Sequence, residues 1–522
     1  MSSSFKINPI PHQTVFASTQ SNSVDRARYR HFVYILIGIS LLVRVLFIGV
    51  NQLLVEEAYY WNYAQHLDFS YLDHPPMVAL LIKLSTVIFG TSEFGIRVFA
   101  ILCWLLMAFF SFKLTECVSY GAGKYAVLLL AILPYFFMQS VVMTPDLPLL
   151  VAWSGALYCL YRALILNESS LCYAAGFWIG LGMLSKYTIC LLGPATLLYV
   201  ILVPSARVWL MRKELYLSGL LAMVLFTPVI YWNANHEWVS FLFQSTRRMN
   251  DLPHFCFHYF LGLLLLFLTP LGVLGLCSLF RKNTIQIKML PIKRLRFFQV
   301  YLMVPLIFFG VISVRHPIRL TWIGPCLLAV VPWLAMLLHQ SAESLKPRVL
   351  KMGLFSGACL ILFYSGMFVT IVSGRPEIAS ELFFNNFFDW RDFTAQVHAI
   401  VKEAEKTSSL LPIIIPLDAY NIASELNVYQ EILFAQGAIQ KRYQVEGQHY
   451  FGENSLMYQY WSKNDNLRER PVLLLSRDQD NFKIPRFQGT VMLKSPILRF
   501  WAHSQGKGDE MRPYYYQWVE MK

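Results

Sequence analysis

The chain has 522 residues, of which 56% are hydrophobic and only 14% are charged, and its mean hydropathy is +0.46. Repeated apolar runs of about 20 residues match the ~30 Å hydrocarbon core of a bilayer, which excludes a soluble protein and predicts a polytopic α-helical membrane protein. The formal net charge is +13, but the basic residues lie in short loops between apolar runs, where they orient the chain, so nucleic acid is excluded as a partner.

Residues 1–31 form a polar N-terminal tail that ends in Arg26, Arg28 and Arg30, directly before the first apolar run. The apolar run is longer than the core of a cleavable signal, and no small-residue cleavage site follows it. We therefore expect the first span to remain as an anchor, with the tail in the cytoplasm.

A polar loop directly follows the first span. Glu56 and Glu57 are adjacent, and Asp73 and His74 follow within twenty residues. The loop is rich in aromatic residues, namely Tyr59, Tyr60, Trp61, Tyr63 and Tyr71. One interpretation is a solvated loop with an interfacial aromatic belt. The other is a catalytic loop, because aromatic faces and a carboxylate base suit a sugar substrate.

The apolar runs between residues 32 and 373 predict about eleven spans. They are 32–53, 95–117, 125–143, 147–166, 171–186, 187–204, 214–231, 257–280, 297–314, 320–338 and 352–373. Residues 76–90 are omitted because this stretch is short and carries Lys83 in its middle, so we expect a helix lying in the interface. With this count, most loop Lys and Arg residues fall on the cytoplasmic side, as the positive-inside rule requires.

The same count places a second set of polar residues together on the outer face. They are the Glu56–His74 loop, Asp146 at a helix start, Lys186 at a helix break, the loop 232–238 with His236, Arg247 and Arg248, and Arg315, His316 and Arg319. Charges at helix ends often extend to the interface without a function, and a lone His is usually structural. Lys186 is different, because it stands alone in more than thirty largely apolar residues.

Residues 374–522 are mixed polar and predict a separate extracytoplasmic α/β domain. An amphipathic helix is expected over 391–406, and buried strands over 411–415, 472–475 and 490–493. All nine cysteines lie at or before Cys359, scattered in apolar segments, which favours small core residues over a disulfide framework.

Six ordered motifs make the sequence resemble the GT-C superfamily of integral-membrane glycosyltransferases, in the family 39 branch of protein O-mannosyltransferase-like and aminoarabinose-transferase-like enzymes. The motifs are Glu56-Glu57-Ala58-Tyr59-Tyr60-Trp61, Tyr71-Leu72-Asp73-His74-Pro75-Pro76, Phe94-Gly95-Ile96-Arg97, Thr144-Pro145-Asp146-Leu147-Pro148-Leu149, Gly182-Met183-Leu184-Ser185-Lys186-Tyr187-Thr188 and Trp232-Asn233-Ala234-Asn235-His236-Glu237-Trp238. The first acidic residue of the family is typically Asp, whereas Glu56 stands here.

The resemblance implies a catalytic membrane domain over 32–373 that takes a sugar from a polyprenyl-phosphate donor. The acceptor would be lipid A or core lipopolysaccharide, a glycolipid or a protein at the outer face of the bacterial inner membrane. Such a reaction needs a base for the acceptor hydroxyl and cations for the departing phosphate. We assign Glu56 as base, with Asp146 as its alternative or partner, and Glu57 as the orienting residue.

The remaining candidates bind the donor or an ion. Lys186, Arg97 and Arg319 are expected at the phosphate, and His74, Tyr59 and Tyr60 at the substrate. No cofactor is required, although Asp73, His74 and His236 are candidate ligands for a divalent ion.

Two other classes of function stay open at this point. A lipid-linked sugar transporter or flippase would also be polytopic, but it places ionisable groups near the middle of spans rather than at helix ends. A structural subunit of polysaccharide assembly would tolerate the loss of Glu56.

Overall fold

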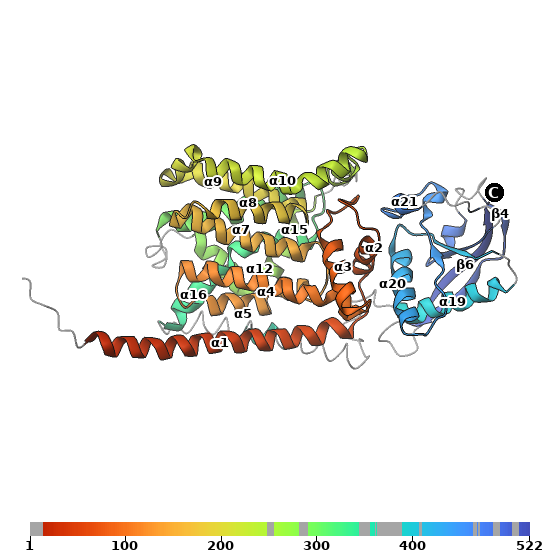
Figure 1. The fold of residues 1–522 in the computed structure, drawn as a ribbon, viewed down its shortest axis with the longest axis horizontal. Coiled ribbons are helices and arrows are strands. Elements are labelled where there is room, and N and C mark those ends of the chain that lie inside the picture. Colours follow the sequence, from red (N-terminus) through yellow and green to blue (C-terminus); the bar gives the residue numbers. More distant parts are fainter. Residues whose placement is uncertain are drawn as a thin grey trace, which may run out of the picture.

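The computed structural model describes residues 14–247, 255–280, 291–343, 389–406, 410–462, 470–483, 491–503 and 511–521, with a few single positions between them. Figure 1 shows a bundle of helices followed by a separate α/β part, with two short helices between them. The predicted span over 352–373, the domain boundary at 374 and Arg248 lie wholly or largely outside the described residues.

Five described helices are long and apolar enough to cross a membrane, and one bent pair brings the number to six. The five lie in α1 (Thr14–Val50), α4 (Glu93–Val118), α7 (Asp146–Leu166), α10 (Lys213–Asn235) and α14 (Ile292–Ser313). The bent pair joins Thr321–Ala329 to Val331–Gln340 at 48°. The multi-pass character of the chain is thus confirmed.

The other predicted spans within the described residues are also helical, but they are shorter or broken. They are α5 (Gly123–Ile132) with α6 (Pro134–Gln139), α8 (Leu171–Met183), η1 (Tyr187–Leu191) with α9 (Leu192–Leu202), and α12 (Phe257–Phe280). Pro134 separates α5 from α6, because proline lacks the N–H that a continuing helix requires. In α12 the backbone leaves the helical region at Thr269, directly before Pro270. The count of eleven spans therefore stays a prediction.

Short elements connect the long helices. These are η2 (Pro204–Met211), α11 (Val239–Leu242), η3 (Phe243–Arg247), α15 (Leu320–Ile323), η4 (Gly324–Ala329) and α16 (Val331–Glu343). The polar loop after α1 contains α2 (Val55–Gln65) and α3 (Met77–Phe89). Both lie at the end of the bundle that faces the α/β part, as expected for an interfacial position (Figure 1). Helix α3 packs against α2 and α4.

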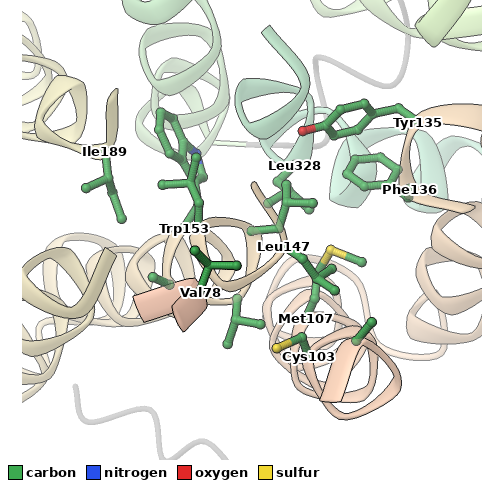
Figure 2. Close-up of a cluster of buried hydrophobic side chains, with 14 of the residues drawn as sticks. Val78, Cys103, Met107, Tyr135, Phe136, Leu147, Trp153, Ile189 and Leu328 are labelled. Atoms are coloured by element: carbon green, nitrogen blue, oxygen red, sulfur yellow. The ribbon is translucent and has the colours of Figure 1, made fainter. Parts of the chain in front are cut away.

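Apolar side chains from several helices meet directly beneath the polar loop. Figure 2 shows Val78, Met107, Leu147, Trp153 and Leu328 pointing toward one another, and each is at most 1% exposed. They come from α3, α4, α7 and η4. Burial of each such side chain contributes about 1.5–3 kcal/mol relative to water, although a bilayer reference lowers that gain, and close packing fixes the helix ends above the core.

Helices α8 and α10 approach closely through glycines. A Cβ added at Gly176 would overlap the backbone carbonyl oxygen of Ser218, and one at Gly180 would lie 2.7 Å from the side chain of Leu225. Small residues allow this approach, which is a common way to pack helices in membranes. The spacing of α8 and α10 therefore depends on the absence of side chains at these two positions.

The α/β part contains a six-stranded mixed sheet in the order β2-β1-β3-β6-β4, with β5 also paired to β6. Its elements are α19 (Trp390–Glu405), β1 (Ile413–Pro416), α20 (Asn421–Ala435), β2 (Gln444–Val445), η5 (Gln448–Phe451), α21 (Tyr458–Trp461), β3 (Pro471–Ser476), η6 (Gln479–Phe482), β4 (Val491–Lys494), β5 (Leu498–His503) and β6 (Met511–Met521). Strand β1 is parallel to β2 and β3, whereas β6 is antiparallel to its neighbours. The expected helix and the three expected strands are present.

Helix α20 docks the α/β part onto α2. The Tyr429 hydroxyl accepts from the Leu53 backbone N–H at 2.8 Å, and the Asn62 side chain donates to the Ser424 carbonyl oxygen at 3.2 Å. A second contact joins Arg391 to Glu93 at the start of α4, with N–O distances of 2.8 Å to both carboxylate oxygens. The polar loop is therefore held between the bundle and the sheet domain.

Glu425 is a buried acid within this interface. Its side chain has no exposed surface, and neither carboxylate oxygen has a hydrogen-bond partner among the described residues. Burial, and then the charges of Glu57 and Glu56, hold the pKa of Glu425 well above its usual range. The folded state then binds more protons than the unfolded chain. Glu425 therefore lowers the free energy of unfolding as pH rises above the ordinary pKa of a carboxyl group.

We predict that Glu425→Gln raises the melting temperature of the full-length protein, and that the gain is larger at about pH 8 than at about pH 5, where wild-type Glu425 is already protonated. Thermal unfolding in detergent at the two pH values measures this difference. Glu431→Gln is the matched control, because Glu431 lies on the same helix in a more exposed pair with Arg442. An increase in melting temperature that is equal at both pH values would contradict the prediction.

Candidate active site

A buried ion pair between Glu57 and Arg97 fixes the start of α2. Arg97 Nε lies 2.8 Å from Glu57 Oε1, and Arg97 Nη2 lies 2.5 Å from Glu57 Oε2. The two side chains are 0% and 3% exposed. Glu57 also accepts from the backbone N–H groups of Leu54 at 3.0 Å and Met143 at 2.9 Å. Glu57 therefore anchors the start of α2 to α4 and to the backbone at Met143.

The remaining donors of Arg97 point at main-chain carbonyl oxygens. They bind the oxygens of Ile48 at 3.2 Å, Asn51 at 2.8 Å and Gln52 at 2.9 Å. Together with the two bonds to Glu57, these contacts use all five N–H donors of a guanidinium group. Arg97 has no donor left for a phosphate, so its assignment as a phosphate ligand is corrected to a structural role.

Glu56 has the opposite environment to its neighbour Glu57. Its side chain is exposed, and none of the described residues forms a hydrogen bond or an ion pair with it. Glu56 and Glu57 are both in the first turn of α2, where the helix dipole favours negative charge. Since successive helical residues point in different directions, Glu57 anchors the turn and Glu56 remains available for a substrate.

The aromatic residues of the loop form a packed wall around Asp73. The Tyr63 hydroxyl donates to Asp73 Oδ1, and the Tyr59 hydroxyl lies 3.4 Å from the same oxygen. The Tyr63 and Tyr71 rings stack at 3.9 Å, and the Tyr60 ring packs edge-on against His74 at 5.7 Å. Tyr59 is 2% exposed and Tyr60 is 7% exposed, so these side chains mainly shape the loop.

Lys186 and Asp146 form a largely buried ion pair. Lys186 Nζ lies 2.6 Å from Asp146 Oδ1, and it donates to Thr321 Oγ1 of α15 at 3.4 Å. The break between α8 and η1 places Lys186 there, because Ser185 Oγ donates to the Pro145 carbonyl oxygen at 2.7 Å. Pairing with Asp146 is a property of Lys186 that the sequence alone did not reveal.

The buried Tyr60 and the half-buried Tyr420 are both affected by charged groups of the site. After burial, the carboxylates of Asp73, Asp146 and Glu56 raise the pKa of Tyr60. The pKa of Tyr420 is raised to about 12 by burial, then Glu56, then Asp73, while Arg319 opposes the rise. Both rings pack against Tyr59, at 5.8 Å for Tyr60 and 4.6 Å for Tyr420. Glu56 and Asp73 act electrostatically on both rings, whereas Asp146, which binds Lys186, acts on Tyr60 and Arg319 acts on Tyr420.

His236 lies on a neighbouring loop and is held by Trp232. The two rings stack at 4.0 Å, and His236 Nδ1 lies 2.8 Å from the Trp232 carbonyl oxygen. Trp232 Nε1 donates to Asp68 at 2.8 Å, which ties this loop to the first one. Within the described part of the chain, no group of three or more His, Cys, Asp and Glu side chains is placed to hold a metal ion. Asp73, His74 and His236, the candidate ligands for a divalent ion, are thus not gathered in such a group.

The α/β part contributes residues that were not among the predicted site residues. The Tyr420 ring lies 4.6 Å from that of Tyr59, and the Met457 backbone N–H donates to the Tyr59 hydroxyl at 3.2 Å. Asp418 fixes the start of α20 by accepting from the Asn421 N–H at 2.7 Å. No pattern in the sequence indicated that these residues contact the distant polar loop.

Two comparisons with known proteins match part of the chain. The family model described as dolichyl-phosphate-mannose-protein mannosyltransferase matches residues 73–232. The lipid A galacturonosyltransferase RgtD of Rhizobium johnstonii is 26% identical over 207 residues, which are 38% of this chain and 41% of that relative. The aligned part is thus less than half of the curated relative.

Solved structures cover nearly the whole chain. ArnT from Cupriavidus metallidurans in the apo state is 14% identical with a TM-score of 0.61, over 94% of this chain and 98% of ArnT. The same protein bound to undecaprenyl phosphate gives a TM-score of 0.63 over 93% and 98%, again at 14% identity. The resemblance drawn from the sequence motifs is therefore confirmed, and the chain has the fold of the ArnT-like branch of GT-C glycosyltransferases.

Proposed function

We propose that the protein is a glycosyltransferase that moves a sugar from a polyprenyl-phosphate donor to lipid A or a related envelope acceptor. The observation that carries the proposal is the exposed Glu56 carboxylate beside Tyr60 and Tyr420, two rings that both pack against Tyr59. Glu56 acts electrostatically on Tyr60 together with Asp146, which binds Lys186, and on Tyr420 together with Arg319. A base and two cations at one site match the needs of sugar transfer from a phosphate.

In this reaction, the acceptor hydroxyl oxygen forms a bond to the anomeric carbon of the sugar. The bond from that carbon to the phosphate oxygen breaks, and the polyprenyl phosphate leaves with the bonding electrons. Glu56 takes the hydroxyl proton, while Lys186 and Arg319 balance the charge of the leaving phosphate. Asp146 holds Lys186 in place before the donor binds.

An apolar groove offers a place for the donor's hydrocarbon chain. It has a volume of about 560 Å³, and α12 and α14 form it with Phe257, Phe260, Leu306, Gly310 and Val314. Val314 directly precedes the exposed Arg315, and His316 and Arg319 follow in the same loop. The groove therefore ends beside the cationic segment that supplies a phosphate ligand.

The comparisons support the choice of substrates. The similar RgtD is named for transfer to lipid A, and the ArnT structure is of a protein bound to undecaprenyl phosphate. We further propose that the N-terminal tail is cytoplasmic and that the α/β domain, from about residue 374 onward, faces the periplasm. The loop charges favour this orientation under the positive-inside rule.

Replacing the proposed base tests the chemistry. Glu56→Gln keeps the shape of the side chain but removes its basicity, so transfer should fall by about 10²–10⁴-fold. Glu56→Asp keeps a base and should retain more activity than Glu56→Gln. The measurement is transfer of labelled sugar from polyprenyl-phosphate donor to lipid A by purified protein. Glu403→Gln, a change at an exposed site on α19, is the control. Near-normal turnover of well-folded Glu56→Gln would assign the base to another group.

A second experiment separates the structural and chemical roles of Lys186. Lys186→Met alone leaves the largely buried Asp146 unpaired, which should cost about 3–5 kcal/mol of stability. The double variant Lys186→Met/Asp146→Asn removes both charges and should recover most of this loss. Its transfer rate should nevertheless stay at least about 10²-fold below wild type, because the leaving phosphate loses a cation.

Lys186→Arg should keep part of the activity, since it keeps the charge. Thermal unfolding and initial rates at limiting donor provide the two readouts. Wild-type rates in the stable double variant would show that the phosphate is bound elsewhere.

A further inference from the structure

A large groove lies between α1 and α4, at the end of the bundle away from the α/β domain. Figure 1 shows that the N-terminal part of α1 and the C-terminal part of α4 lie at this end, whereas the active-site loop lies at the other. The groove has a volume of about 970 Å³. It is therefore separate from the site proposed for sugar transfer.

One face of each helix lines the groove. On α1 the lining residues include Arg26, Tyr29, Arg30, Val33 and Ile37, and on α4 they include Leu105, Phe109, Phe112 and Lys113. Their spacing of three or four residues places them on one stripe of each helix. Tyr29 fixes the pair of helices, because its ring stacks on Phe112 at 6.4 Å and its hydroxyl donates to Glu116 at 2.6 Å.

The groove is polar at one end and apolar along its length. Arg26, Arg30 and Lys113 lie at the terminal end, and Val33, Ile37 and Leu105 lie further into the predicted span. From Arg26 to Ile37 the helix rises by roughly 16 Å, which is about the reach of one acyl chain across a leaflet. This order of cations and apolar residues matches an amphiphile with an anionic head.

The charges of the groove are not balanced within it. Arg26, Arg30 and Lys113 have no carboxylate partner among the residues that the structure describes, and Lys113 rests over the Phe109 ring at 5.7 Å. Glu116 is the acidic residue among the lining residues. It is engaged by Tyr29 and by the backbone N–H groups of Gly121 at 3.2 Å and Gly123 at 2.8 Å. The mouth of the groove therefore carries an excess of positive charge.

We propose that this groove binds an anionic phospholipid of the leaflet that contains the N-terminal end of α1. The phosphate of the lipid lies at Arg26, Arg30 and Lys113, and one acyl chain lies along Val33, Ile37 and Leu105. Basic clusters beside membrane helices attract anionic headgroups, and the apolar floor selects a lipid over a free anion. This proposal does not depend on the proposed sugar transfer.

The test compares lipids with equal acyl chains on the purified full-length protein. Native mass spectrometry counts retained dioleoyl phosphatidylglycerol and dioleoyl phosphatidylcholine in mixed micelles. We expect the wild-type protein to prefer the anionic lipid by about tenfold or more. The variant Arg26→Gln/Arg30→Gln/Lys113→Gln should lose this preference to within about threefold, and Ile37→Trp should weaken retention although it keeps every charge.

The matched control is Arg28→Gln/Arg207→Gln/Lys213→Gln, which removes the same number of positive charges from exposed residues that do not line the groove. It should keep the wild-type preference. Equal retention of both lipids by wild type, or equal loss in the control and the groove variant, would overturn the proposal. Displacement of phosphatidylglycerol by an equal concentration of inorganic phosphate, or preferential retention of undecaprenyl phosphate in the groove, would also overturn it.

Discussion

The geometry of the candidate active site depends on the buried pair of Glu57 and Arg97. This pair connects the end of α1, the start of α2, the side of α4 and the backbone at Met143, because each donor and acceptor reaches a different segment. Removing one partner of such a pair leaves an uncompensated charge away from water, at a cost of several kcal/mol. The pair thus fixes the turn that presents the exposed Glu56, for which we propose the role of base.

The α/β domain is part of this arrangement rather than an attachment to it. Its helix α20 lies on α2, and Tyr420 packs against Tyr59 beside the charged residues of the loop. The helix bundle supplies Asp146, at the start of α7, and Lys186, at the break between α8 and η1. Asp146 and Lys186 are largely buried, so the attraction between their charges is stronger than it would be in water.

Most elements could be predicted from the sequence, because apolar length and periodicity are local properties. The positions of the long helices, of α3 and of three strands follow from them. Glu56 and Lys186 became candidates for another reason, since each is a charged residue beside long apolar runs. The partners of those residues could not be predicted in the same way. Arg97 looked like a phosphate ligand, since an isolated arginine gives no hint that carbonyl oxygens more than forty residues earlier will use its donors. The role of Tyr420 likewise depends on docking between segments far apart in the chain.

The close contact of α8 with α10 has a consequence for the site. Lys186 follows the end of α8, and Trp232 lies in the last turns of α10. The distance between these two helices depends on the contact of Gly176 with the backbone of Ser218. A methyl group at Gly176 would separate the two helices without changing the identity of any polar side chain of the site. The relative position of Lys186 and Trp232 is thus controlled from inside the bundle, by glycines that lie away from both residues.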